Sequence, residues 1–140
     1  TPHADPDARG AFVGLSLRHN RGALVRALLE GVAFGLRDSL ELLRELGVQP
    51  EVGRVSGGGA RSDLWRSIAA SVLDLPLETT AVTEGAAYGA ALLALGGDPR
   101  ETAAKAVQVH GRTNPDPDWV AHYAEVYDRF RALYPALRGI

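Results

Sequence analysis

The spacing of apolar residues along the chain predicts several amphipathic helices. Between residues 22 and 46, leucines and valines recur three or four positions apart, which is the period of one face of a long helix. Gly47 is expected to end this helix. Gly31 and Gly35 lie within it, where each costs about 1 kcal/mol relative to alanine, so we expect another backbone to pack closely there. Further helices are expected from Ser62 onward and over residues 84–95, 98–109 and 118–133.

Short apolar runs predict three strands, over residues 11–17, 52–56 and 75–80. A predicted helix follows each of the last two strands, which gives two strand–helix units in succession. Such alternation is typical of an α/β domain with a mostly parallel sheet covered by helices. Because a stable open sheet usually has about four to six strands, we expect a parent domain to supply further strands.

The composition fits one globular domain, or part of one. The 140 residues are 46% hydrophobic and 23% charged with a net charge of −2, which argues against disorder and against a nucleic-acid partner. The absence of cysteine excludes a disulfide framework, a thiolate metal site and a cysteine nucleophile. The sequence also has no methionine, so we expect a piece of a longer protein.

The apolar runs are short. None reaches about 18 residues, so we expect no transmembrane helix and no membrane partner. The visible N-terminus lacks a basic segment followed by an apolar one, which argues against a signal peptide. We therefore expect a cytoplasmic protein.

A triple glycine between a predicted strand and a predicted helix is the strongest candidate for chemistry. Residues 57–59 lack side chains, so a ligand can approach their backbone closely. The free N–H groups and the positive dipole end of the following helix suit phosphate oxygens. The carboxyl end of a strand is also where α/β proteins bind ligands. The pattern favours a nucleotide site, and a glycine turn chosen for packing alone is the alternative.

Two charged residues near these glycines refine the prediction. Asp63 lies in the first turn of the helix, where its carboxylate would repel a polyphosphate, so we expect it to face the base or ribose of a nucleotide. Arg61 could neutralise phosphate, although a solvated side chain is the simpler interpretation. The segment is not a Walker A loop, because no Lys-Ser/Thr pair follows the glycines, and it does not fit G-x-G-x-x-G.

Other polar and small residues carry weaker signals. Residues 83–91 begin a helix rich in small side chains, for which tight packing is the favoured interpretation. Thr83 is its expected N-cap, and Glu84 is either a first-turn acid or a ligand contact. Asp5 and Asp7 are expected to be turn acids rather than an acid or metal pair. The aromatic stripe of the last helix is expected to pack in a core or an interface. The four histidines show no metal-ligand spacing and receive no role.

Four ordered motifs together resemble the C-terminal domain of FGGY-family carbohydrate kinases, with xylulokinases as the closest match. The motifs run from Thr1-Pro2-His3 to Leu15, from Arg26 to Phe34, from Gly57 to Ser62, and from Glu84 to Ala91. They keep the family's order and spacing from the first residue to about Leu95. Four motifs in order are far more specific than a glycine turn alone.

The resemblance implies a two-domain kinase of the ribonuclease-H-like, actin-like ATPase fold. Residues 1–140 would form part of its C-terminal ATP-binding domain, an α/β unit with a short mixed sheet and flanking helices. Such kinases transfer the γ-phosphoryl of Mg²⁺-ATP to a sugar, here D-xylulose, to give D-xylulose 5-phosphate. The general base is an Asp of the N-terminal domain, so no catalytic residue is expected in this chain, which alone should be inactive. Mg²⁺ is expected to be held by ATP and by that domain, and no metal ligand is expected here.

The resemblance also assigns the nucleotide site and the partners. Asp63 stands where the family places a polar contact to adenine. The implied partners are the chain's own N-terminal domain, a sugar, and a possible second copy of the full-length enzyme. Ala23 and Leu28 depart from the family's second motif, which weakens the assignment of one exact substrate. The alternatives are therefore a kinase for glycerol, ribulose, gluconate or fuculose, or a non-catalytic nucleotide-binding or interaction domain of the same superfold. The implied ATP-binding residues are Gly57, Gly58, Gly59, Ala60, Arg61, Ser62 and Asp63.

Overall fold

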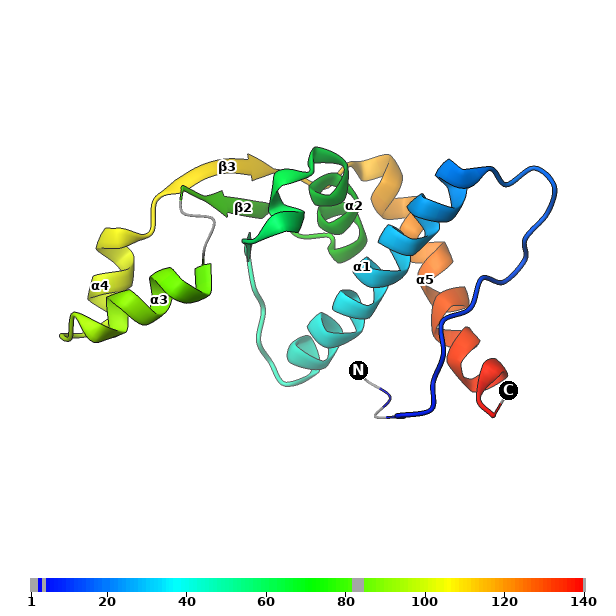
Figure 1. Ribbon diagram of the computed structural model, residues 1–140, viewed down its shortest axis with the longest axis horizontal. Coiled ribbons are helices and arrows are strands. Elements are labelled where there is room, and N and C mark those ends of the chain that lie inside the picture. Colours follow the sequence, from blue (N-terminus) through cyan, green and yellow to red (C-terminus); the bar gives the residue numbers. More distant parts are fainter. Residues whose placement is uncertain (1–2, 4, 82–84, 140) are drawn as a thin grey trace.

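Helices on both sides of a small sheet make up the structure, a computed structural model that describes residues 3, 5–81 and 85–139. Figure 1 shows the sheet and α2 in the middle, α1 and α5 on one side, and α3 and α4 on the other. This arrangement confirms the expected α/β class. In chain order the elements are α1 (Arg21–Glu45), β1 (Gly53–Val55), the 3₁₀ helix η1 (Gly58–Arg61), α2 (Asp63–Leu73), β2 (Leu77–Thr80), α3 (Gly85–Ala94), α4 (Pro99–Ala106), β3 (Val109–Thr113) and α5 (Pro117–Leu137).

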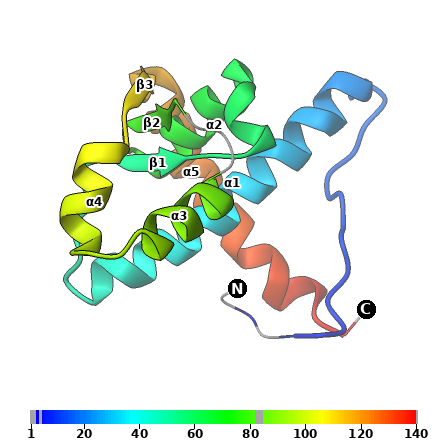
Figure 2. The same cartoon turned by 60° about the vertical axis from the view of Figure 1, so that its left-hand side comes forward.

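The sheet has three described strands in the order β1-β2-β3 (Figure 2). β1 and β2 run parallel, with Gly53 opposite Leu77, and α2 forms the crossover between them. β2 and β3 run antiparallel, with Leu77 opposite Thr113. A Cβ at Gly53 would lie 2.7 Å from Cδ2 of Leu77, so any larger residue there would require the buried Leu77 side chain to shift. The short mixed sheet implied by the family resemblance is confirmed, whereas the mostly parallel sheet expected from the pattern is wrong.

Two sequence predictions about strands are wrong for a shared reason, which is that tertiary pairing decides where a strand forms. Residues 11–17 alternate like a strand, but they form none, and the described part of the chain places no partner strand beside them. The helix expected over 98–109 ends at Ala106 instead. The residues after it gain a ladder with β2 and become β3.

Capping residues define the helix ends as the sequence indicates. The Asn20 side chain accepts a hydrogen bond from the Ala23 N–H at 3.0 Å and starts α1. Gly47, with φ of +85°, follows its last turn, and the Val48 N–H donates to the Leu43 carbonyl at 3.0 Å. Asp98 caps α4, since its side chain accepts hydrogen bonds from the Arg100 and Glu101 N–H groups. The helix boundaries are therefore largely local properties of the sequence.

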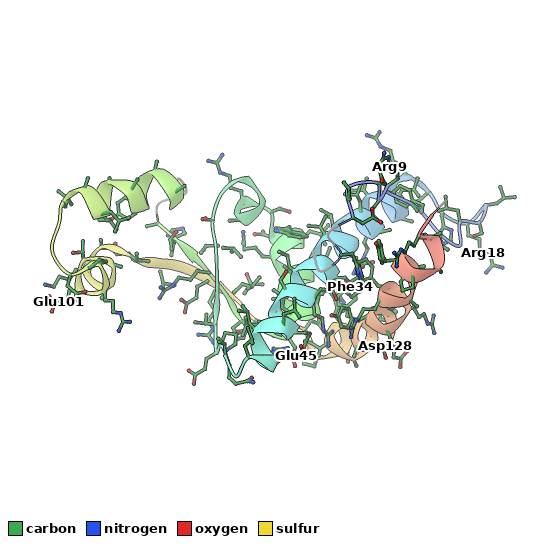
Figure 3. All side chains as sticks on the ribbon, turned by 90° about the horizontal axis from the view of Figure 1, so that it is seen from below. Arg9, Arg18, Phe34, Glu45, Glu101 and Asp128 are labelled. Carbon is green, nitrogen blue, oxygen red and sulfur yellow. The ribbon has the colours of Figure 1, made fainter. Side chains whose placement is uncertain are left out.

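The main core lies between α1, α2 and α5. Figure 3 shows Phe34 of α1 pointing toward α5, and its ring centroid lies 5.8 Å from that of Tyr123 and 5.9 Å from that of Tyr127. The aromatic stripe of α5 is thus core packing, as predicted. The buried members of this core are Ala33, Phe34, Ile68, Val72, Tyr123 and Tyr127. The other face of α2 packs on the sheet through Ala69, Ala70 and Leu77. Helix α2 is consequently held on two sides, which fixes the position of its N-terminus.

The helical glycines of α1 do not mark a close contact within the described residues. A Cβ built at Gly31 or Gly35 would meet no atom within 4 Å outside the helix's own backbone. The expectation that another backbone packs closely there is therefore wrong for the part of the chain that the structure covers.

Candidate functional site

The predicted nucleotide-binding residues form one continuous corner at the carboxyl end of β1. After Ser56, Gly57 takes a φ of +82°, which glycine adopts at little cost, and the chain enters η1. Ala60 is buried beneath the turn, whereas the three glycines, Arg61 and Ser62 are exposed. The structure thus places residues 57–63 in one continuous segment, in which every residue except Ala60 is exposed and Asp63 begins α2.

The three glycines are needed for different reasons. Gly57 supplies the positive φ. A Cβ at Gly59 would lie 3.1 Å from Nε1 of Trp65, so a side chain there would require the Trp65 ring to shift slightly. At Gly58 the φ is ordinary and a Cβ would meet nothing within 4 Å in the described part of the chain. Packing against Trp65 therefore accounts for Gly59 and the positive φ accounts for Gly57, while Gly58 leaves room for a ligand.

The start of α2 presents polar groups beside this turn. The Ser62 Oγ accepts a hydrogen bond from the Trp65 N–H at 3.2 Å, which makes Ser62 the N-cap. Asp63 is the first residue of the helix, and its side chain is 91% exposed. Because the first N–H groups of a helix have no intrahelical acceptors, this end can bind an anion. The Arg61 side chain is exposed, in line with the solvated interpretation.

Arg66 is a residue of the site that the sequence reasoning missed. Its guanidinium donates hydrogen bonds to the Ala60 carbonyl and to Oδ1 of Asp63. Its Nε also donates to Oγ1 of Thr113, at the end of β3, at 3.2 Å. The pairing with Asp63 at a spacing of three residues on a helix was visible in the sequence. The contacts to Ala60 and Thr113 depend on the tertiary structure.

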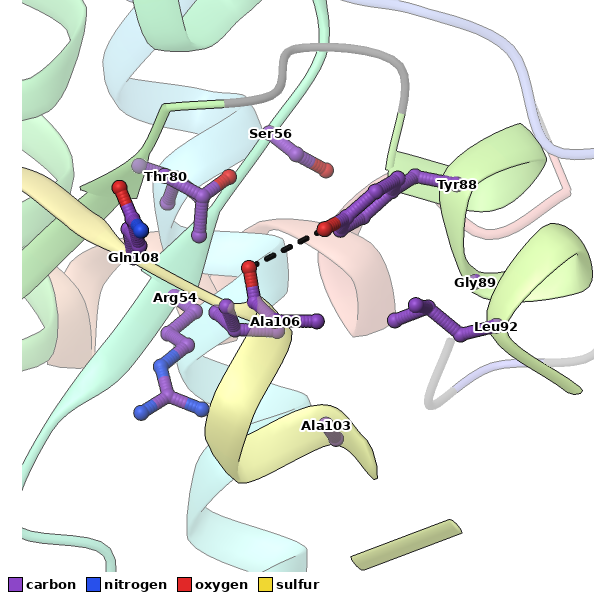
Figure 4. Close-up of a pocket in the computed structure, with 11 residues that line it drawn as sticks. Arg54, Ser56, Thr80, Tyr88, Gly89, Leu92, Ala103, Ala106 and Gln108 are labelled. Carbon is purple, nitrogen blue, oxygen red and sulfur yellow. Dashed lines mark hydrogen bonds between the residues drawn. The ribbon is translucent and has the colours of Figure 1, made fainter. Parts of the chain in front are cut away.

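A small cavity adjoins the glycine turn on the side of α3 and α4 (Figure 4). It has a volume of about 270 Å³ and is lined by the ends of β1 and β2 and by both helices. The Tyr88 hydroxyl donates to the Ala106 carbonyl at 3.1 Å and so joins the two helices. Small-molecule pockets usually measure about 300–1,000 Å³, so this cavity lies just below the lower end of that range.

A larger hollow of about 840 Å³ separates the N-terminal segment from the end of α5. The His3 ring stacks on Tyr134 at a centroid distance of 3.8 Å, and Figures 1 and 2 both show the N-terminal segment passing beside the end of α5. The Tyr134 hydroxyl donates to Oδ2 of Asp5 at 2.8 Å, and this bond is the main cause that lowers the pKa of Asp5. The Asp7 N–H donates to Oδ1 of Asp5 at 2.9 Å, which supports their interpretation as turn acids. Three arginines and three aspartates line the hollow, so it offers a polyphosphate no excess positive charge.

Two buried tyrosines of α5 are bound to charged residues of α1. The Tyr123 hydroxyl donates to Glu30 at 2.8 Å and accepts from Arg26 at 3.0 Å. Burial, followed by the bond to Glu30, raises the pKa of Tyr123 to about 12. The Tyr127 hydroxyl donates to Asp38 at 2.7 Å, and burial raises its pKa. Both phenols stay neutral at physiological pH and hold α5 against α1, which is a structural role.

Three further features were searched for in the described residues: a metal site, the expected start of α3, and a membrane-spanning helix. They contain no group of three or more His, Cys, Asp or Glu side chains that could hold a metal ion. Thr83 and Glu84, the expected N-cap and first-turn acid of α3, lie outside the described residues. Among the helices that are described, none is long and apolar enough to span a bilayer.

The glycine turn and its flanking helices match a known family. The model of the C-terminal domain of the FGGY family of carbohydrate kinases matches residues 1–96, which include β1, the turn and α2. This chain belongs to that family. The xylulose kinase of Escherichia coli (strain K12) is 34% identical to this FGGY domain over 98% of the chain. The family resemblance drawn from the four motifs is therefore confirmed.

Solved structures of FGGY kinases share the fold. The xylulose kinase from Rhodospirillum rubrum has 40% sequence identity and a TM-score of 0.77 over 95% of this chain. The gluconate kinase from Lactobacillus acidophilus has 27% identity and a TM-score of 0.82 over 94% of it. The expected actin-like ATPase fold is thus confirmed. The chain spans 29% of the Escherichia coli kinase and 28% of each of the two solved chains.

Proposed function

We propose that this chain is the nucleotide-binding part of an ATP-dependent sugar kinase, with ATP lying across the turn formed by residues 57–63. One observation carries the proposal: Gly58 is exposed, has an ordinary φ and faces open space at the N-terminal end of α2. A backbone without a side chain is suited to the close approach of a ligand such as a nucleotide. Membership of a carbohydrate-kinase family supports ATP as that ligand.

In the proposed reaction, the full-length enzyme transfers the γ-phosphoryl of ATP to a hydroxyl of D-xylulose. The sugar oxygen forms a bond to the γ-phosphorus, the bond to the β,γ-bridging oxygen breaks, and ADP leaves. A general base outside this chain accepts the hydroxyl proton. The match to a xylulose kinase over nearly the whole chain supports D-xylulose as the substrate. The similarity to a gluconate kinase keeps other sugars and polyols as alternatives.

Asp63 and the glycines are expected to contact different parts of the nucleotide. Gly58 and Gly59 are expected to line the ligand with backbone atoms, because neither presents a side chain to the surface. The exposed carboxylate of Asp63 would repel a phosphate but can accept a hydrogen bond from the amino group of adenine. We therefore propose that the base lies toward Asp63 and that the phosphates extend away from it.

Mg²⁺ is expected to arrive with ATP. The described residues offer no cluster of carboxylates or histidines for a dedicated metal site. Mg²⁺ commonly binds through substrate phosphates and one or two carboxylates, and it neutralises charge during phosphoryl transfer. We propose that its protein ligands lie in the part of the kinase outside this chain.

The proposal requires polypeptide beyond residues 1–140. The relatives are more than three times as long as the matched segment, and we propose that their additional domain corresponds to an N-terminal partner domain that carries the base and the sugar contacts. We also propose that the kinase acts in the cytoplasm, where both ATP and sugars are present, and that two full-length copies can pair. Residues 1–140 alone should not turn over substrate.

A kinase assay on the full-length protein tests the proposal. Purified enzyme with Mg²⁺-ATP is offered D-xylulose, ribulose, glycerol, gluconate and fuculose, and ADP formation gives kcat/KM for each. Preference for D-xylulose is expected, and preference for another member of the panel would replace the substrate while keeping the kinase. ATP binding without turnover of any sugar would indicate a non-catalytic nucleotide-binding domain. Xylulose-dependent ADP formation by residues 1–140 alone would overturn the claim that the base lies outside this chain.

A further inference from the structure

A single arginine joins the glycine turn, the start of α2 and the end of β3. The Arg66 guanidinium donates to the Ala60 carbonyl in η1, to Oδ1 of Asp63, and through Nε to Oγ1 of Thr113 at 3.2 Å. Its side chain is only 20% exposed. The planar guanidinium fixes the directions of its N–H donors, so it holds these three acceptors in one mutual arrangement.

The contact with Ala60 acts on the glycine turn itself. Ala60 lies between the exposed glycines and the N-cap of α2, and its side chain is buried. Gly57 and Gly58 have no side chains to anchor them, and glycine is the most flexible residue in a backbone, although the Gly57 carbonyl accepts a hydrogen bond from the Ala60 N–H at 3.2 Å. The hydrogen bond to the Ala60 carbonyl therefore restrains the segment on which a ligand would lie.

The contact with Asp63 acts on the charge and direction of that carboxylate. The Asp63 side chain is 91% exposed, so the ion pair adds little to folding stability. It does place a positive charge beside the carboxylate, which reduces its repulsion of a phosphorylated ligand. It also fixes Oδ1, so that Oδ2 can face a donor on the ligand.

We propose that Arg66 is a positioning residue of the nucleotide site. It acts through the Ala60 carbonyl and the Asp63 carboxylate, which it holds in the arrangement that receives ATP. This inference rests on the proposed function, since it assumes that the nucleotide lies across residues 57–63.

The test compares Arg66→Ala with a matched change at Arg44 of α1, whose guanidinium contacts the opposite end of α2. Arg44 also donates to a carboxylate and to a carbonyl, namely Glu41 at 2.8 Å and Leu73 at 3.4 Å, but it lies away from the glycine turn. In the full-length kinase, Arg66→Ala should raise the KM for ATP about tenfold and leave the KM for the sugar within about twofold. Arg44→Ala should leave both KM values within about twofold, even if it lowers the melting temperature as much.

Two further variants separate positioning from folding. Arg66→Lys keeps the positive charge but loses the planar set of N–H donors, so it should restore only part of the ATP affinity. If Arg66→Ala does not fold, Arg66→Lys replaces it in the comparison. In the Asp63→Asn background, Arg66→Ala should have a smaller effect on the KM for ATP than in the wild type, because the two residues act together.

Defined outcomes overturn the inference. It fails if Arg66→Ala leaves the KM for ATP unchanged, if Arg44→Ala raises that KM equally, or if Arg66→Lys behaves as the wild type. If a change at Gly58 weakens ATP binding but Arg66→Ala does not, the proposed function stands and only the role of Arg66 is removed. A full-length protein that binds no ATP would remove both.

Discussion

Replacing Gly58 by valine separates a ligand-binding role of the glycine turn from a structural one. A side chain at Gly58 enters open space at an ordinary φ, so it strains neither the backbone nor its neighbours. Gly58→Val should therefore leave the folded structure intact. It should also restrict the unfolded chain, which stabilises a protein by about 0.4–1 kcal/mol when the native conformation tolerates the new residue. The expected melting temperature is thus equal to that of the wild type or slightly higher.

The effect of Gly58→Val on ATP should be large. The isopropyl group occupies the surface on which the nucleotide would lie, so the ligand loses its close approach to the backbone N–H groups. The loss of one hydrogen bond to a charged group such as a phosphate costs about 1.5–3 kcal/mol, and about 1.4 kcal/mol corresponds to a tenfold change in affinity. We therefore expect the dissociation constant for ATP to rise at least about tenfold.

The assay is titration calorimetry of the full-length kinase with ATP, together with thermal unfolding. Gly10→Val is the matched control, because a Cβ at Gly10 also meets nothing within 4 Å and Gly10 lies away from the turn. Gly59→Val should differ from both by lowering the melting temperature, since its Cβ would lie 3.1 Å from Nε1 of Trp65. ATP affinity in Gly58→Val that equals the affinity of the Gly10→Val control would refute the assignment of ATP to this turn.

Three further predictions concern stability. Tyr123→Phe removes the hydroxyl that joins Glu30 and Arg26, which should cost about 1–3 kcal/mol in urea unfolding, and a cost near zero would show that the buried bonds contribute nothing. Gly35→Ala should raise the free energy of unfolding by up to about 1 kcal/mol, and a decrease would reveal a neighbour that excludes the methyl group. Because the pKa of folded Tyr123 is raised to about 12 from its ordinary value of 10.0, its contribution is complete below pH 10 and is lost as the pH rises through 12. The free energy of unfolding should fall less steeply over that interval in Tyr123→Phe than in the wild type, and equal slopes would contradict this origin.

Local sequence signals predicted most of the helices but not the full sheet. The caps at Asn20, Ser62 and Asp98 act within one turn of the chain, so their positions could be inferred from neighbouring residues. Strand β3 could not, because residues 109–113 become extended by pairing with β2, which lies some thirty residues away in the sequence. The alternating pattern of residues 11–17 failed in the opposite sense, since a strand needs a partner and none is present among the described residues.

The candidate site likewise combines features that are local in the sequence with features that depend on the tertiary structure. Its position followed from three adjacent glycines before a helix, a purely local pattern. The distinct reasons for Gly58 and Gly59 could not be read from that pattern, because they depend on where Trp65 packs. Arg66 was missed since two of its three contacts join residues that only the fold brings together.

The most direct test of the central claim is a crystal structure of the full-length kinase with a non-hydrolysable ATP analogue. We expect the nucleotide to lie within about 4 Å of the backbone of Gly58 and Gly59, with its base toward Asp63. A well-ordered nucleotide bound elsewhere, with the turn of residues 57–63 left in solvent, would contradict the claim.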